Sequence, residues 1–156
     1  MKLNNHKKVS FLISGNGSNL LKILKKNHIN KDFKVIAIIS NNNISTKIKS
    51  YVGKFYKDVL VKEYQRTLQK ENFNNTDIIF SVGYMKIIEK RIINNFDVIN
   101  LHPSILPNYK GLMTQKRMLI NNEKFFGFTS HKVSLELDGG KTISNKTKKI
   151  NTKRES

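Results

Sequence analysis

The chain has 156 residues, of which 38% are hydrophobic, and its formal net charge is +18. This length suits one domain with a hydrophobic core. The absence of Cys excludes a disulfide framework, a thiol nucleophile and a thiolate metal site. No apolar run reaches the length of a membrane span, and the N-terminal residues lack a signal-peptide pattern. We therefore expect no membrane partner and a cytoplasmic location.

The large positive charge has two interpretations. It could indicate a nucleic-acid partner, because lysines neutralise phosphates. However, the lysines are spread along the chain, and we find no RNA-recognition aromatic motif, zinc finger or recognition-helix signature. We favour a compositional bias toward Lys, Asn and Ile. A nucleic-acid partner is therefore not expected, and the charge would attract anionic substrates.

Short apolar, β-branched runs alternate with segments of helical spacing. Strands are expected at residues 9–13, 33–40, 58–61, 77–82, 97–99 and 126–133, and helices at 20–26, 45–51, 63–71, 87–94 and 114–121. Such alternation predicts an α/β fold with a doubly wound, mostly parallel sheet of the Rossmann-like type.

The composition changes near Lys141. Beyond it the chain is rich in Lys, Thr, Asn and Ser, and only Ile143 and Ile150 are aliphatic. A segment with so little apolar surface to bury is typical of disorder. We therefore predict a single domain over residues 1–141 and a disordered basic tail over residues 142–156.

The segment 14–19 (Ser-Gly-Asn-Gly-Ser-Asn) joins the first strand to the first helix. Glycines allow a sharp turn, and a helix N-terminus offers free N–H groups to an anion. Ser18 is expected to be the N-cap. The segment matches neither a Walker A motif nor a full G-x-G-x-x-G, and it could serve only as a connection.

The segment 100–107 follows the fifth strand and contains both prolines of the chain, Pro103 and Pro107. Proline stiffens a turn and restricts the residue before it. Asn100 could stabilise an oxyanion through its amide, and His102 could move a proton near neutral pH. Alternatively, Asn100 caps a turn and His102 is a structural loop histidine.

Asp138 precedes two glycines. It could occupy a left-handed turn with its carboxylate aimed inward, or it could belong to an ordinary turn.

Four stretches, taken together, carry a family resemblance. They are residues 13–20, 82–87, 100–112, and 129–131 with 136–140. In this order and spacing they closely resemble the folate-dependent phosphoribosylglycinamide formyltransferases of purine biosynthesis, over roughly residues 8–143. The chain resembles a form of that family shortened at its C-terminus.

The resemblance implies that the formyl group of 10-formyltetrahydrofolate, the co-substrate, is transferred to the amine of glycinamide ribonucleotide, without a metal. It implies that Asn100 stabilises the oxyanion and that His102 manages the proton. Asp138 would favour the charged imidazole and hold a proton-shuttling water. His131 would orient Asp138, or would instead face solvent from its strand. The implied binding residues are Gly17, Ser18 and Asn19 for the substrate phosphate, and Lys62, Met85, Lys86, Ile87, Ile88 and Asn100 for the folate.

Two departures from the family pattern keep other functions open. Lys62 stands where a folate-binding arginine is expected, and the polar tail replaces a strand and a long helix. The alternatives are a weakly active or inactive remnant, another formyltransferase of the same superfamily, or a basic RNA-associated protein. A homo-oligomer is also left open.

Overall fold

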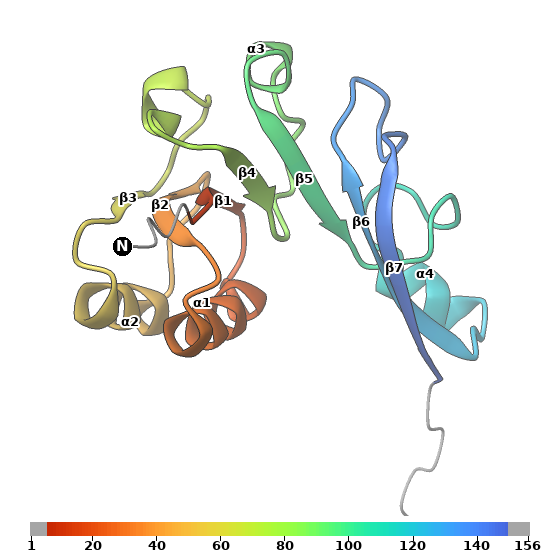
Figure 1. Cartoon of the computed structure of the whole chain (residues 1–156). Coiled ribbons are helices and arrows are strands. Elements are labelled where there is room, and N and C mark those ends of the chain that lie inside the picture. The colour runs from red at the N-terminus through yellow and green to blue at the C-terminus, as the bar shows by residue number, and fades with distance from the viewer. Residues whose placement is uncertain (1–5, 150–156) are drawn as a thin grey trace, which may run out of the picture. The chain divides into compact units, whose positions relative to one another are not determined.

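The computed structural model describes residues 6–149, and it divides at β5 into two compact units, residues up to Ile99 (unit 1) and from Asn100 onward (unit 2). Figure 1 shows the elements. In chain order they are β1 (Lys8–Ile13), α1 (Ser18–Asn30), β2 (Lys34–Ser40), α2 (Thr46–Phe55), β3 (Leu60–Lys62), the 3₁₀ helix η1 (Lys70–Phe73), β4 (Ile78–Ser81), α3 (Lys90–Ile93), β5 (Asp97–His102), α4 (Thr114–Ile120), β6 (Phe125–Lys132) and β7 (Thr142–Lys149).

The strands follow the order β3-β2-β1-β4-β5-β6-β7. Strand β1 pairs in parallel with β2 and β4, and β2 pairs in parallel with β3. Strands β6 and β7 pair antiparallel. The predicted α/β class with a mostly parallel sheet is therefore confirmed.

Unit 1 is organised around an apolar core. Five of the six residues of β1 are buried, as are five of the seven of β2, which is typical of central parallel strands. Leu20 and Leu24 of α1 and Ile48 and Val52 of α2 pack into this core at helical spacing. Burial of this apolar surface holds β1 in place and so positions the segment that follows it.

The first helix begins differently from the prediction. The N-cap is Gly17, which adopts a left-handed conformation (φ 66°), and Ser18 is the first helical residue, with no side-chain cap hydrogen bond. A Cβ at position 17 would collide with Ile48 of α2. Glycine is therefore required at position 17 for both its conformation and its size.

The helix predicted at residues 63–71 is wrong. Residues 63–69 are irregular with bends, η1 begins at Lys70, and Tyr64 has a positive φ. The carboxylate of Glu63 accepts a hydrogen bond from the backbone N–H of Ile44 at 2.6 Å, and that of Glu89 accepts from Leu68 N–H at 2.9 Å. Side chains distant in sequence thus satisfy the backbone, which local spacing cannot reveal.

Unit 2 corrects the predicted tail. Residues 142–149 form β7, although all eight are exposed. The strand pairs with β6 from Phe125↔Lys149 to His131↔Thr142, and Ser130 and Ser144 join their hydroxyls at 2.8 Å. Backbone pairing replaces apolar burial here, so composition alone gave the wrong prediction. Residues 150–156 lie outside the described part.

Two further elements differ in length. Strand β5 continues to His102, so Asn100 and His102 lie in the strand and not beyond its end. Helix α3 spans four residues, fewer than the predicted 87–94. Over residues 6–149, no helix is both long and apolar enough to cross a membrane.

Candidate active site

Asn100 and His102 lie two residues apart near the end of β5. Because side chains alternate along a strand, residues at this spacing face the same side. His102 is almost fully buried, at 4% exposure, and Asn100 is half-buried. The strand thus presents an amide and an imidazole together.

Both ring nitrogens of His102 have partners. Nε2 lies 2.8 Å from the carbonyl oxygen of Tyr109, and Nδ1 lies 3.4 Å from Oδ2 of Asp138. A carbonyl can only accept, so Nε2–H is the donor and that proton is held. Nδ1, facing the carboxylate, is the nitrogen left to gain or lose a proton.

The Tyr109 carbonyl is held from several directions. It also accepts from the Arg117 guanidinium at 3.0 Å and from the Thr114 hydroxyl at 3.3 Å. The Tyr109 hydroxyl donates to Glu123 at 2.5 Å, and this hydrogen bond to the carboxylate raises the pKa of Tyr109. Helix α4 therefore holds the Tyr109 carbonyl in place, and this carbonyl in turn orients the imidazole of His102.

Asp138 adopts the expected left-handed conformation, with φ 48°. Its Oδ2 accepts a hydrogen bond from Gly111 N–H at 2.8 Å, and its side chain is largely buried. A Cβ at Gly140 would overlap the carbonyl of Lys132, so only glycine lets the loop return this closely to β6. The inward carboxylate predicted from the sequence is confirmed by this geometry.

His131 is buried at 2% exposure, so the solvent-facing alternative is wrong. Its Nδ1 lies 3.0 Å from the Lys132 carbonyl and must donate to it. Its Nε2 lies 3.2 Å from Asn100 Nδ2 and 3.5 Å from Asp138 Oδ1. His131 therefore touches both neighbours and sets which way the Asn100 amide faces.

The glycine-rich loop lies in unit 1. Its residues Gly17, Ser18 and Asn19 form the N-cap and first turn of the 13-residue helix α1. The buried Ser14 just upstream accepts from Met85 N–H at 2.7 Å and donates to Asn41 at 2.5 Å. This hydroxyl ties the loop after β1 to the loop after β4, so two predicted binding segments are neighbours within unit 1.

The predicted folate residues of unit 1 differ in accessibility. Met85, Lys86 and Ile87 are exposed, whereas Ile88 is buried. The side chain of Ile88 therefore packs in the interior and can offer a ligand only its backbone. The Lys62 ammonium is 2.8 Å from Asn72 Oδ1, so a neutral amide is its partner in unit 1.

Sequence reasoning missed Arg117 and the role of Tyr109. The contact from Tyr109 uses its backbone carbonyl, for which the sequence carries no signal. Arg117 lies on α4, and nothing in the sequence indicates that its guanidinium donates to backbone carbonyls beside the site. Among residues 6–149, no group of three or more His, Cys, Asp or Glu is arranged to hold a metal ion.

Comparison with known proteins gives the family of this chain. The model of the family described as formyl transferase matches residues 7–156. The phosphoribosylglycinamide formyltransferase of Haemophilus influenzae is 31% identical over 156 residues, covering 88% of this chain and 70% of that protein. The Escherichia coli protein of the same name is 32% identical over 144 residues, covering 85% and 68%.

A solved structure extends the likeness to three dimensions. The phosphoribosylglycinamide formyltransferase of Campylobacter jejuni subsp. jejuni superimposes with a TM-score of 0.73 at 29% identity, covering 96% of this chain and 84% of that one. The chain belongs to the formyl transferase family.

Proposed function

We propose that the chain transfers the formyl group of 10-formyltetrahydrofolate to the amine of glycinamide ribonucleotide, as a step of purine biosynthesis in the cytoplasm. The observation that carries the proposal is the cluster of Asn100, His102, His131 and Asp138 in unit 2, in which both histidines are buried. It combines an amide donor with an imidazole and a carboxylate, the groups that acyl transfer requires.

In the proposed reaction the substrate amine attacks the formyl carbon, forming a C–N bond and a tetrahedral oxyanion. The Asn100 amide donates to that oxygen, with its orientation set by His131. The ammonium proton passes by way of His102 Nδ1 and Asp138 to the departing folate nitrogen. The bond between that nitrogen and the carbon then breaks, leaving the formylated amine and tetrahydrofolate.

We further propose that Gly17, Ser18 and Asn19 bind the substrate phosphate. The first turn of α1 supplies backbone N–H groups without intrahelical partners, together with the positive end of the helix dipole. For the folate we propose the exposed residues Met85, Lys86 and Ile87, the backbone of Ile88, Asn100, and Lys62 for a carboxylate of the co-substrate. A lysine pairs with a carboxylate as a point charge, without the planar fork of arginine.

The test is a formyl-transfer assay with purified chain, 10-formyltetrahydrofolate and glycinamide ribonucleotide. We expect turnover that Asn100→Ala lowers by about 10²–10³-fold, the usual cost of losing an oxyanion donor. A control substitution at the exposed Asn43 should leave the rate unchanged. Equal rates for Asn100→Ala and the parent chain would refute the assignment.

The same assay separates the remaining alternatives. A different formyltransferase would accept another amine in place of glycinamide ribonucleotide. An inactive remnant would bind folate and transfer nothing to any amine. Turnover confined to glycinamide ribonucleotide is the outcome that the proposal requires.

A further inference from the structure

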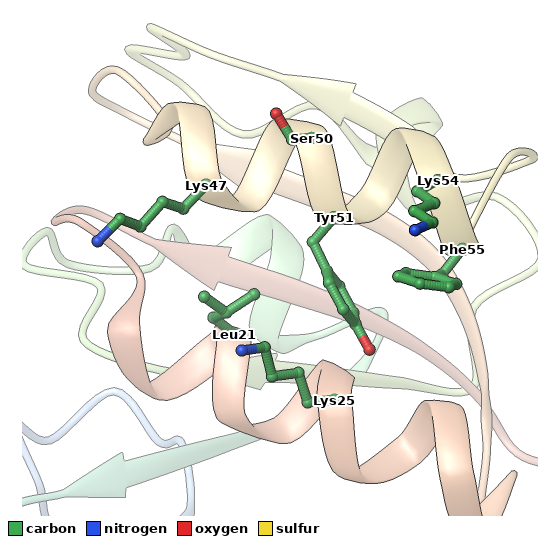
Figure 2. Close-up of a pocket in the computed structure, with 7 residues that line it drawn as sticks. All are labelled: Leu21, Lys25, Lys47, Ser50, Tyr51, Lys54 and Phe55. Atoms are coloured by element: carbon green, nitrogen blue, oxygen red, sulfur yellow. The ribbon is translucent and has the colours of Figure 1, made fainter.

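A basic groove lies between helices α1 and α2 in unit 1, and none of the residues that line it is among those assigned above. Its cavity of about 380 Å³ has three lysines, Lys25, Lys47 and Lys54, around the apolar side chains of Leu21, Tyr51 and Phe55. Figure 2 shows the lysines distributed over both helices, with Tyr51 pointing from α2 toward α1. We call this site the α1–α2 groove.

The groove has no negative charge from its own helices. Neither α1 nor α2 contains Asp or Glu, although together they carry six lysines. One of these, Lys49, pairs with Glu63 at 3.2 Å. Among the residues that the structure describes, Lys25, Lys47 and Lys54 form no ion pair. The groove therefore presents uncompensated positive charge, which favours an anionic ligand.

Aromatic rings stand among these lysines. The Tyr51 and Phe55 rings are 4.7 Å apart, and the His28 ring of α1 lies 4.4 Å from the Phe55 ring, tilted by 47°. The ammonium groups of Lys54 and Lys25 lie over Phe55 and Tyr51, at 5.1 Å and 5.9 Å from the ring centres. Phe55 is exposed and Tyr51 half-buried, so ring surface is accessible to a planar ligand.

We propose that the α1–α2 groove binds single-stranded nucleic acid. Lysines that follow a phosphate backbone, interleaved with aromatic rings on which bases stack, are what sequence-tolerant single-strand binding requires. The proposal differs from the expectation drawn from the sequence, because the site combines side chains from two helices and no linear motif marks it. Such binding would be a second activity, beside formyl transfer.

The spacing of the lysines favours a strand over a free nucleotide. Lys47 and Lys54 are seven residues apart on one helix, or about 10 Å at 1.5 Å per residue. Successive phosphates of one stacked strand are about 3.4 Å apart along its axis. The two ends of the groove therefore reach different phosphates of a chain, whereas a mononucleotide would use one end.

The test is fluorescence anisotropy of a labelled 12-nucleotide oligouridylate with the full chain, measured over a range of salt concentrations. Three variants are compared: Lys25→Gln/Lys47→Gln/Lys54→Gln, Phe55→Ala, and the matched control Lys57→Gln/Lys70→Gln/Lys124→Gln. The control removes the same charge from exposed lysines elsewhere. General attraction by the +18 chain therefore affects both triple variants equally.

We expect the groove triple variant to lower the slope of log affinity against log salt by about 2, because each single-strand phosphate contact contributes about 0.7. Phe55→Ala should weaken binding about 10-fold at unchanged charge, the effect of losing one stacked base. The control triple variant should retain most of the slope. A 4-thiouridine cross-link should map to residues 51–55.

Three results would overturn the proposal. The control triple variant could reduce affinity and slope as much as the groove variant, which would indicate charge alone. Phe55→Ala could bind the oligonucleotide as tightly as the parent chain. Polyglutamate could displace the oligonucleotide at equal charge concentration with the same dependence on Phe55, which would assign the groove to an acidic peptide.

Discussion

In unit 1 about three quarters of the buried side chains are apolar, whereas in unit 2 the buried side chains are mostly polar. Among the described residues of unit 2, Met118 is the single buried hydrophobic side chain, beside buried His102, Ser104, Thr114, Thr129 and His131. Unit 1 is therefore stabilised by non-directional apolar burial, and unit 2 by directional hydrogen bonds. Directional contacts are what a site needs to hold an imidazole and an amide in fixed orientations.

The loop after β5 illustrates the second strategy. The Thr129 hydroxyl donates to the Ser104 carbonyl at 2.7 Å and accepts from Leu106 N–H at 3.1 Å. The Ser104 hydroxyl donates to the Asn108 carbonyl at 2.6 Å. Two hydroxyls thus position the segment that carries the Tyr109 carbonyl to His102.

The largest effect is expected at the centre of the polar unit. His102→Ala should lower the turnover rate about 10²–10⁴-fold, the usual contribution of general acid–base catalysis. A steady-state formyl-transfer assay measures it, with His28→Ala, a histidine of unit 1, as the control of unchanged rate. Near-normal turnover in His102→Ala would refute the proposed role of His102 in proton transfer.

In unit 1 the largest expected effect is on the free energy of unfolding. Leu24 is fully buried on α1, so Leu24→Ala should lower the free energy of unfolding by about 2–5 kcal/mol. Ile29 on the same helix is 79% exposed, and Ile29→Ala should change it by no more than about 0.5 kcal/mol. Urea titration followed by circular dichroism compares the two, and equal losses would contradict the placement of the core.

A smaller loss is expected from removing one hydroxyl of unit 2. Thr129→Val keeps the side-chain shape but leaves Leu106 N–H and the Ser104 carbonyl without their partner. We expect a loss of about 1–3 kcal/mol in unfolding free energy, the cost of buried polar groups left unpaired. Thr147→Val on the exposed strand β7 is the matched control. If both substitutions are neutral, unit 2 does not depend on its hydrogen bonds.

The smallest effect concerns pH. The hydrogen bond from Ile44 N–H, aided by Lys49, holds the pKa of Glu63 below its ordinary value of 4.5. A depressed folded-state pKa adds stability that is present above the unfolded value and is lost as pH falls through the folded one. Glu63→Gln should therefore lower the melting temperature slightly at pH 7, and this difference should shrink as the pH falls below 4.5.

The sequence predicted the parts of this molecule that depend on local pattern. Runs such as Phe11–Ile13 indicate buried strands, and the left-handed turn at Asp138 follows from the glycines after it. Asn100, His102 and Asp138 are candidates because of their side chains and the family resemblance, and the structure places His102 Nδ1 3.4 Å from Asp138 Oδ2.

What the sequence could not show depends on contacts between distant residues. In the segment 63–71, which is not helical, the backbone N–H groups of residues 64 and 65 donate to the carbonyls of residues 42 and 40, and that of Leu68 donates to the Glu89 carboxylate. Strand β7 exists through pairing with β6, and His131 is buried by its neighbours in the fold. No periodicity within those segments distinguishes these outcomes from their alternatives.

The Tyr109 carbonyl has a consequence for how the site tolerates variation. The group that accepts from His102 Nε2 is a main-chain carbonyl, which every amino acid has. Exchanging the residue at 109 would alter the aromatic ring and its hydroxyl but would leave that oxygen in place, provided that the loop keeps its course. The path of the backbone therefore determines which ring nitrogen of His102 holds its proton. A substitution at position 109 would not change this directly.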